Sequence, residues 1–187
     1  MGDDAQETTI DLSNGSASIK LGNYTYTVQA TFVEGFVATK SNFWIDFREM
    51  RKSTNPAPDD AALAAAKEIE YVVDEYYKDQ SVSKSFGKGA TNMQVLQSIL
   101  EYGVSLGKFT RDNTTTGSDV TYVAKIDGLG EFSVGSMSGW MYTDNPDESI
   151  NPENWYTAPI GAADYKMSTT SKIAWFFVVD YSTHPWQ

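Results

Sequence analysis

The chain has 187 residues, enough for one well-buried domain, and its 41% hydrophobic and 13% aromatic content is typical of a globular fold. Its formal net charge of −11 argues against nucleic acid or an anionic membrane as a partner. The absence of cysteine excludes disulfide scaffolds, thiol catalysis and Cys-based zinc sites, and the sequence has no apolar run long enough to span a bilayer.

The N-terminal third is rich in strand signals. Residues 1–12 are polar and lack the basic and apolar regions of a signal peptide, so we interpret them as a flexible leader. From Ser16 to Phe32 apolar and polar residues alternate on either side of Gly22-Asn23, which predicts a β-hairpin. The run from Phe36 to Phe47 is aromatic and β-branched and predicts a third strand.

An amphipathic helix follows the proline-rich loop 52–58. Asp59 or Asp60 can cap its N-terminus, and the helix is predicted to run to about Lys78. The residues predicted to form its buried face share helical spacing: Ala62, Ala66, Ile69, Val73 and Tyr76.

A second helix is predicted after a short strand over Ser81 to Phe86. Thr91 and Gln94 have the spacing of a capping box, and apolar residues between 93 and 100 form the buried stripe. Gly103 is the residue that we expect to end this helix in a left-handed conformation.

The last third, from Thr121 to Tyr181, carries most of the aromatic residues. Within it the segment SGWMYTDN places Trp140 and Tyr142 on one face of a strand, because side chains alternate across a strand. Two interpretations follow: an aromatic platform for a ring-shaped ligand, or a core position between sheet and helix. We favour the core for Trp140, because large aromatic side chains dominate core burial.

Three segments together resemble a known bacterial family. They are SVSKSFGKGATNMQVLQSIL (81–100), YVAKIDGLGEF (122–132) with its Asp127-Gly128 turn, and SGWMYTDN (138–145) followed by ADYKM and KIAWFF (163–177). From about residue 80 to 180 the chain resembles a bacterial domain-of-unknown-function family related to the C-terminal domain of transcobalamin and intrinsic factor. It departs from that family's pattern in the longer loop opened by Asp144-Asn145-Pro146 and in Thr170-Ser171 before the last strand.

The resemblance implies an α+β fold in a secreted or surface-anchored protein, mostly of Gram-positive anaerobes. The expected core, over 80–187, is a β-grasp-like mixed sheet packed on one helix. A β-hairpin-rich segment and the extra amphipathic helix, together 13–79, precede it within a single domain, 13–187. In the cobalamin carriers the related domain closes over one face of the corrinoid, so the resemblance also suggests cobalamin as a ligand.

The loop from Asp144 to Pro159 is the second candidate site. Its oxygen-bearing side chains suggest calcium, but their spacing does not match a twelve-residue calcium loop, so we predict a solvated acidic loop without a metal. Trp155 and Tyr156 end this loop, and an aromatic pair on a polar loop is often exposed for binding.

Catalytic chemistry is poorly represented. The only histidine is His184, near the C-terminus with no partner evident from the sequence, and motifs for phosphate binding, nucleophilic hydrolysis or zinc proteolysis are absent. We therefore predict a monomeric, non-catalytic, extracellular binding or adhesion module without a required cofactor. Its partner would be a small molecule, a glycan or a protein. Corrinoid binding and glycan binding through loop aromatics are the alternatives, and the candidate site residues are Trp140, Tyr142, Trp155 and Tyr156.

Overall fold

The computed structural model describes residues 16–29, 35–144, 146, 149 and 152–184. By its internal contacts the chain divides into two units, Met1–Glu34 and Gly35–Gln187. The predicted flexible leader, 1–12, lies outside the described residues. The boundary between the units falls at residue 34, whereas the sequence suggested a single domain whose two segments meet near residue 80.

In the first unit the described residues form the predicted hairpin. Strand β1 (Ser16–Leu21) pairs antiparallel with β2 (Tyr24–Gln29), and Leu21 lies opposite Tyr24. Gly22 closes the turn with a positive φ of 61°, a conformation that glycine adopts without the steric cost of a side chain. The predicted hairpin is confirmed, although β2 ends at Gln29 and the residues from 30 to 32 lie outside the described part.

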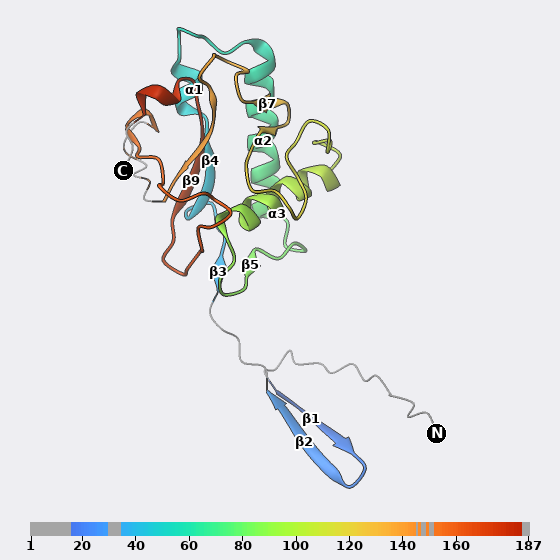
Figure 1. Cartoon of the computed structure of the whole chain (residues 1–187). Helices are drawn as coiled ribbons and strands as arrows, with labels where there is room; N and C mark the ends of the chain where they lie inside the picture. The colour runs from blue at the N-terminus through green and yellow to red at the C-terminus, as the bar shows by residue number, and fades with distance from the viewer. Residues whose placement is uncertain (1–15, 30–34, 145, 147–148, 150–151, 185–187) are drawn as a thin grey trace. The chain divides into compact units, whose positions relative to one another are not determined.

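A mixed three-stranded sheet is the centre of the second unit (Figure 1). Strand β9 (Ile173–Val178) lies between β4 (Phe43–Asp46), to which it is parallel, and β8 (Gly139–Thr143), to which it is antiparallel. All six residues of β9 are buried, as expected for a strand covered on both faces. With helices on one face of this sheet, the predicted α+β class is confirmed.

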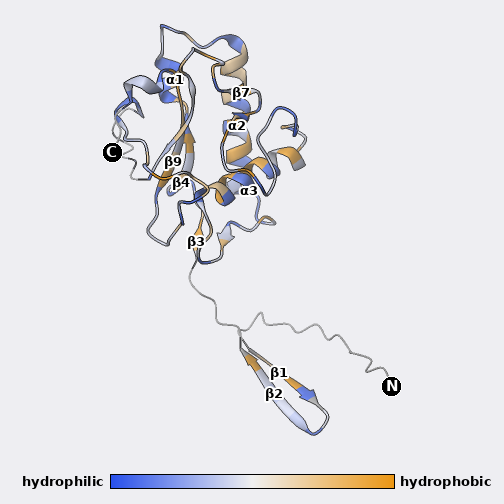
Figure 2. Ribbon diagram, in the orientation of Figure 1, coloured by the Kyte–Doolittle hydropathy of each residue, from blue (hydrophilic) through white to orange (hydrophobic). Residues whose placement is uncertain are grey.

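The long helix α2 (Asp60–Lys78) forms as the sequence predicts. The Asp59 carboxylate accepts a hydrogen bond from the Ala62 N–H at 2.8 Å, and this contact satisfies one of the free donors at the helix start. The predicted apolar stripe is buried in the main core, which α2 shares with the helix-facing side of the sheet. In Figure 2 the ribbon of α2 includes orange, hydrophobic stretches.

Helix α3 (Asn92–Ser105) begins with the predicted capping box. The Gln94 side chain accepts from the Thr91 N–H at 2.8 Å, and the Thr91 hydroxyl accepts from the Gln94 N–H at 3.3 Å. The predicted end of the helix is wrong: α3 continues through Gly103, and Gly107 is the residue with a positive φ, of 68°.

Gly103 instead provides space for a neighbouring ring. A Cβ atom at this position would lie 2.3 Å from Cδ2 of Phe109, closer than two carbons can approach without displacement. Phe109 is itself buried, in the chain segment that returns after the helix. The glycine therefore permits close packing between the helix and this segment, and it does not terminate the helix.

Short elements complete the unit. The helix α1 (Arg48–Lys52) follows β4, and the 3₁₀ helices are η1 (Pro152–Asn154) and η2 (Tyr181–Thr183). Strand β3 (Phe36–Val37) pairs with β5 (Ser85–Phe86), and β6 (Lys125–Ile126) pairs with β7 (Leu129–Gly130) across the Asp127-Gly128 turn.

Two predicted strands are shorter in the structure. The run 36–47 divides into β3 and β4, because the Thr39 N–H binds the Asn42 side chain at 2.7 Å and the chain turns there. The predicted strand 81–86 keeps only Ser85 and Phe86. The Asp127-Gly128 turn has positive φ at both residues, 49° and 79°, as a tight hairpin of this sequence requires.

Candidate functional site

Strand β8 directs Trp140 and Tyr142 toward the helices, and both side chains are buried. Their exposed fractions are 8% and 6%. The Trp140 ring makes edge-to-face contacts with Phe47 and Phe177, at centroid distances of 5.7 and 5.3 Å, and its Nε1–H donates to the Leu129 carbonyl at 2.8 Å. The favoured interpretation of Trp140 as a core residue is therefore confirmed, and its ring is not an open platform.

A pocket of about 230 Å³ lies beside the outer edge of β8. Its lining comes from three segments, residues 140–142 of β8, 121–123 before β6 and 157–162 after η1, together with Met93 and Trp175. None of these lining residues carries a charged side chain. Tyr122 and Ile160 are about half exposed, at 55% and 48%, and both belong to the lining.

The two phenol hydroxyls of the pocket lining already donate hydrogen bonds. Tyr142 donates to the Ile160 carbonyl and Tyr122 donates to the Glu131 carboxylate. Burial raises the pKa of Tyr142 far above its ordinary value, and burial together with the Glu131 hydrogen bond raises the pKa of Tyr122 to about 12. Both phenols are therefore neutral at physiological pH.

The second tryptophan of the pocket, Trp175, was not among the predicted site residues. Trp175 of β9 lines the pocket and stacks at a tilt against Tyr142, with a centroid distance of 5.2 Å. Its Nε1–H donates to Oδ1 of Asn92, a fully buried side chain at the start of α3, at 2.8 Å. The sequence signal was available, because Trp175 lies in the aromatic last strand, but its register against β8 could not be read from the chain.

The prediction that Trp155 is exposed for binding is wrong. Trp155 is 3% exposed and packs on the sheet face opposite the helices, edge-to-face with Phe176 at 5.4 Å and with Trp44 at 6.4 Å. The Arg48 guanidinium lies 5.4 Å from the centre of the Trp155 ring. The second face of β9 is apolar and must be covered, and Trp155 provides this cover.

Tyr156 is the member of the predicted pair that reaches solvent, with 54% of its surface exposed. Since Trp155 points into the core, the two rings do not form a joint surface for a ligand. Of the predicted site residues, Trp140 and Tyr142 line the pocket beside β8, whereas Trp155 and Tyr156 do not.

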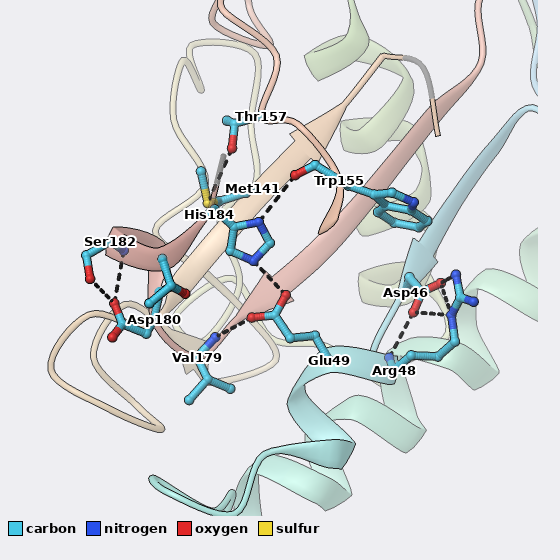
Figure 3. A network of polar contacts seen from close by, with 11 residues as sticks. Asp46, Arg48, Glu49, Met141, Trp155, Thr157, Val179, Asp180, Ser182 and His184 are labelled. Carbon is cyan, nitrogen blue, oxygen red and sulfur yellow. Dashed lines mark hydrogen bonds and ion pairs between the residues drawn. The ribbon is translucent and has the colours of Figure 1, made fainter. Parts of the chain in front are cut away.

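His184 has partners that the sequence did not reveal (Figure 3). Its Nε2 lies 2.8 Å from Oε2 of Glu49 in α1, and its Nδ1 lies 3.4 Å from the Trp155 carbonyl oxygen. The other Glu49 oxygen accepts from the Val179 N–H at 3.3 Å. Both ring nitrogens of this buried histidine thus face acceptors of the protein itself, and the contacts fasten the segment after β9 to α1.

The described residues contain no group of three His, Asp or Glu side chains that could hold a metal ion. Residues 145, 147, 148, 150 and 151 of the predicted acidic loop lie outside the described part. Among the described helices, none has both the length and the apolar character that crossing a bilayer requires.

Comparisons with known proteins gave no match: no family model, no curated protein and no solved structure resembles the chain significantly.

Proposed function

We propose that this chain is a non-catalytic binding module of a secreted or surface-attached bacterial protein, and that the pocket beside β8 receives an apolar or aromatic group. The observation that carries the proposal is the pocket itself. Its lining is uncharged and its residues Tyr122 and Ile160 are half exposed, although the chain as a whole has a net charge of −11. An apolar concavity with a few polar groups is typical of a small-ligand site.

The chemistry of the site supports binding without catalysis. Tyr122 and Tyr142 are neutral and already donate their hydroxyl protons, so neither phenol is prepared to act as a base. Both ring nitrogens of His184 face protein acceptors in the interior. A nucleophile with an adjacent free base is the arrangement that covalent catalysis needs, and neither the pocket nor the histidine supplies one.

The size of the pocket limits the ligand. An apolar cavity of roughly 150 Å³ accommodates a benzene molecule, and pockets for larger organic ligands are roughly 300–1,000 Å³. The volume of about 230 Å³ therefore suits one aromatic ring or a branched aliphatic group. A corrinoid, which the family resemblance suggests, would insert only a peripheral substituent and lie across Tyr122 and Ile160.

The family proposal rests on the sequence resemblance of the segments 81–100, 122–132 and 138–145 to the family related to the transcobalamin C-terminal domain. A β-grasp-like arrangement and an extracellular location follow from the same resemblance and belong to the proposal. Glycan binding has less support, because Trp155 is buried and Tyr156 alone remains exposed.

Nuclear magnetic resonance can test the pocket directly. The chain has five tryptophans, whose indole N–H signals can be followed individually in a ¹⁵N-labelled sample. We expect p-cresol, used as a single-ring probe, to shift the indole signals of Trp140 and Trp175 saturably. Cyanocobinamide and methyl glucoside, added separately, test the corrinoid and glycan alternatives.

A matched pair of variants identifies the pocket as the binding site. Ile160→Glu places a charge in the lining and should weaken p-cresol binding at least about tenfold. Leu106→Glu changes a similarly exposed apolar residue outside the pocket lining and should leave binding unchanged. If none of the three probes shifts the signals of a folded sample, the proposed function is wrong.

A further inference from the structure

The pocket borders an edge of the sheet. β8 pairs with β9 on one side only, and its outer side faces the segments that line the pocket. In an antiparallel strand, the N–H and C=O of one residue point to the same side, and successive residues alternate between sides. The side to which the N–H and C=O of each residue in β8 point can therefore be assigned from a few known hydrogen bonds.

Two hydrogen bonds fix the direction on the outer side. The Ser138 carbonyl accepts from the Phe132 N–H at 3.0 Å, and the Tyr142 carbonyl accepts from the Ala158 N–H at 3.1 Å. Both donors lie outside the sheet, so the even-numbered residues of β8 and the preceding Ser138 direct their own N–H and C=O outward. Trp140, between these two residues, must do the same.

The opposite side of the sheet gives the same assignment. The Ile173 N–H donates to the Asn42 carbonyl at 2.8 Å, so the odd-numbered residues of β9 direct their own N–H and C=O toward β4. Phe177, the partner of Trp140 in the ladder, is one of these residues. Trp140 and Phe177 therefore form a pair that exchanges no backbone hydrogen bonds, and the Trp140 N–H and C=O are directed to the pocket side.

These groups have no hydrogen-bond partner within the described part of the chain. The same holds for the Tyr142 N–H, whereas the Tyr142 carbonyl is occupied by Ala158. The unpaired edge is therefore short: one donor and one acceptor at Trp140, and one donor at Tyr142. Backbone N–H and C=O groups without a protein partner favour a ligand that can hydrogen-bond to them.

The charged groups that act on the tyrosines of the pocket are carboxylates. Apart from neighbouring tyrosines, the electrostatic influences that raise the pKa values of Tyr122 and Tyr142 come from Glu131, Asp144 and Asp164. The Glu131 carboxylate accepts the Tyr122 hydrogen bond, and Asp144 and Asp164 contribute to the raised pKa of Tyr142, so negative charge lies near the uncharged, apolar lining. A ligand that combines an apolar side chain with adjacent positive charge is complementary to both features.

We infer that the gap in the outer edge of β8, between the contacts that Phe132 and Ala158 make with this strand, binds a short extended peptide segment of another protein, in which an apolar or aromatic residue is flanked by basic residues. The peptide residue opposite Trp140 donates its N–H to the Trp140 carbonyl and accepts from the Trp140 N–H. In such a pair the two side chains lie on the same face of the sheet, so the peptide side chain enters the pocket beside Tyr142 and Trp175. This inference rests on the proposed function, because it assigns a ligand class to the same pocket.

The experiment uses the ¹⁵N-labelled full chain and three blocked tripeptides. The first is acetyl-Lys-Phe-Lys-amide, which should shift the backbone amides of Trp140 and Tyr142 saturably. The second carries an N-methyl group on its phenylalanine, which removes the donor for the Trp140 carbonyl but keeps the ring, and should bind at least about tenfold more weakly. The third, acetyl-Glu-Phe-Glu-amide, keeps the backbone and reverses the charge, and should also bind at least about tenfold more weakly at low salt.

The outcomes separate the inference from the proposed function. In the first outcome, p-cresol binds in the pocket but the basic tripeptide produces no saturable shift at 2 mM. This concentration is about twofold above a Kd of 1 mM, which corresponds to a free energy of about −4.1 kcal/mol. The edge then does not bind peptides, and only the inference fails. Equal binding of the N-methylated peptide, or shifts confined to residues outside the pocket lining, likewise overturns the inference. Absence of binding by both p-cresol and the tripeptide overturns the inference and removes the single-ring pocket on which it rests.

Discussion

Replacement of Trp155 by alanine tests whether the sheet has a second, covered face. Trp155 is 3% exposed and contacts Phe176, Trp44 and the Arg48 guanidinium on the side opposite the helices. Truncation of a buried tryptophan to alanine removes its transfer free energy and leaves a cavity, which together cost about 3–5 kcal/mol. We therefore expect Trp155→Ala to lower the free energy of unfolding by about this amount, although Trp155 belongs to a loop.

Urea denaturation followed by far-ultraviolet circular dichroism measures the effect. With an m value of about 2 kcal/mol per molar urea, a loss of 3–5 kcal/mol lowers the midpoint by roughly 1.5–2.5 M. Tyr156→Ala is the matched control, because its ring is 54% exposed and its removal should change stability by less than about 0.5 kcal/mol. If Trp155→Ala stays within about 1 kcal/mol of the unmodified chain, Trp155 does not cover the sheet in solution.

Three further changes address other parts of the second unit, by the same urea measurement. Glu49→Gln removes the carboxylate that faces buried His184 and should cost about 1–3 kcal/mol; a change below about 0.5 kcal/mol would contradict a structural role for the pair. Gly103→Ala forces a methyl group into a packed ring and should cost about 1–3 kcal/mol, whereas Gly87→Ala, in open space, should be nearly neutral; equal effects would refute close packing at the helix. Burial raises the pKa of the Tyr77 hydroxyl far above the unfolded value of about 10, so its contribution to stability is present below pH 10 and is lost as the pH rises beyond it. The decline in stability between pH 10 and 11 should be shallower in Tyr77→Phe, and an unchanged slope would refute this contribution.

Features determined by neighbouring residues could be predicted from the sequence. The start of α2 depends on Asp59 and the N–H three residues later, and the start of α3 depends on Thr91 and Gln94. The Asp127-Gly128 turn is equally local, because it requires two residues that tolerate a positive φ. In each case the interacting atoms belong to residues close in the chain, so the sequence pattern alone contains the geometry.

Features determined by distant contacts could not be predicted in this way. Gly103 has the composition of a helix stop, but its role is set by Phe109, which folds back against the helix. Trp155 stands on a polar loop, and its burial depends on the uncovered face of β9. One signal did exist, since the uninterrupted apolar run of β9 indicates a strand buried on both faces, and such a strand requires a cover from elsewhere in the chain.

The two interpretations of Trp140 describe different atoms of the same residue. Its indole packs against Phe47 and Phe177 in the core, and its Nε1–H is satisfied by Leu129, so the ring stabilises the fold. Its backbone N–H and C=O point off the edge of β8 toward the pocket, where no described residue pairs with them. The packed indole holds the Trp140 N–H and C=O in position, and this lowers the entropic cost of pairing with a ligand. Truncation of Trp140 would therefore disturb the fold and the edge together, whereas N-methylation of the ligand removes one hydrogen bond and leaves the protein unchanged.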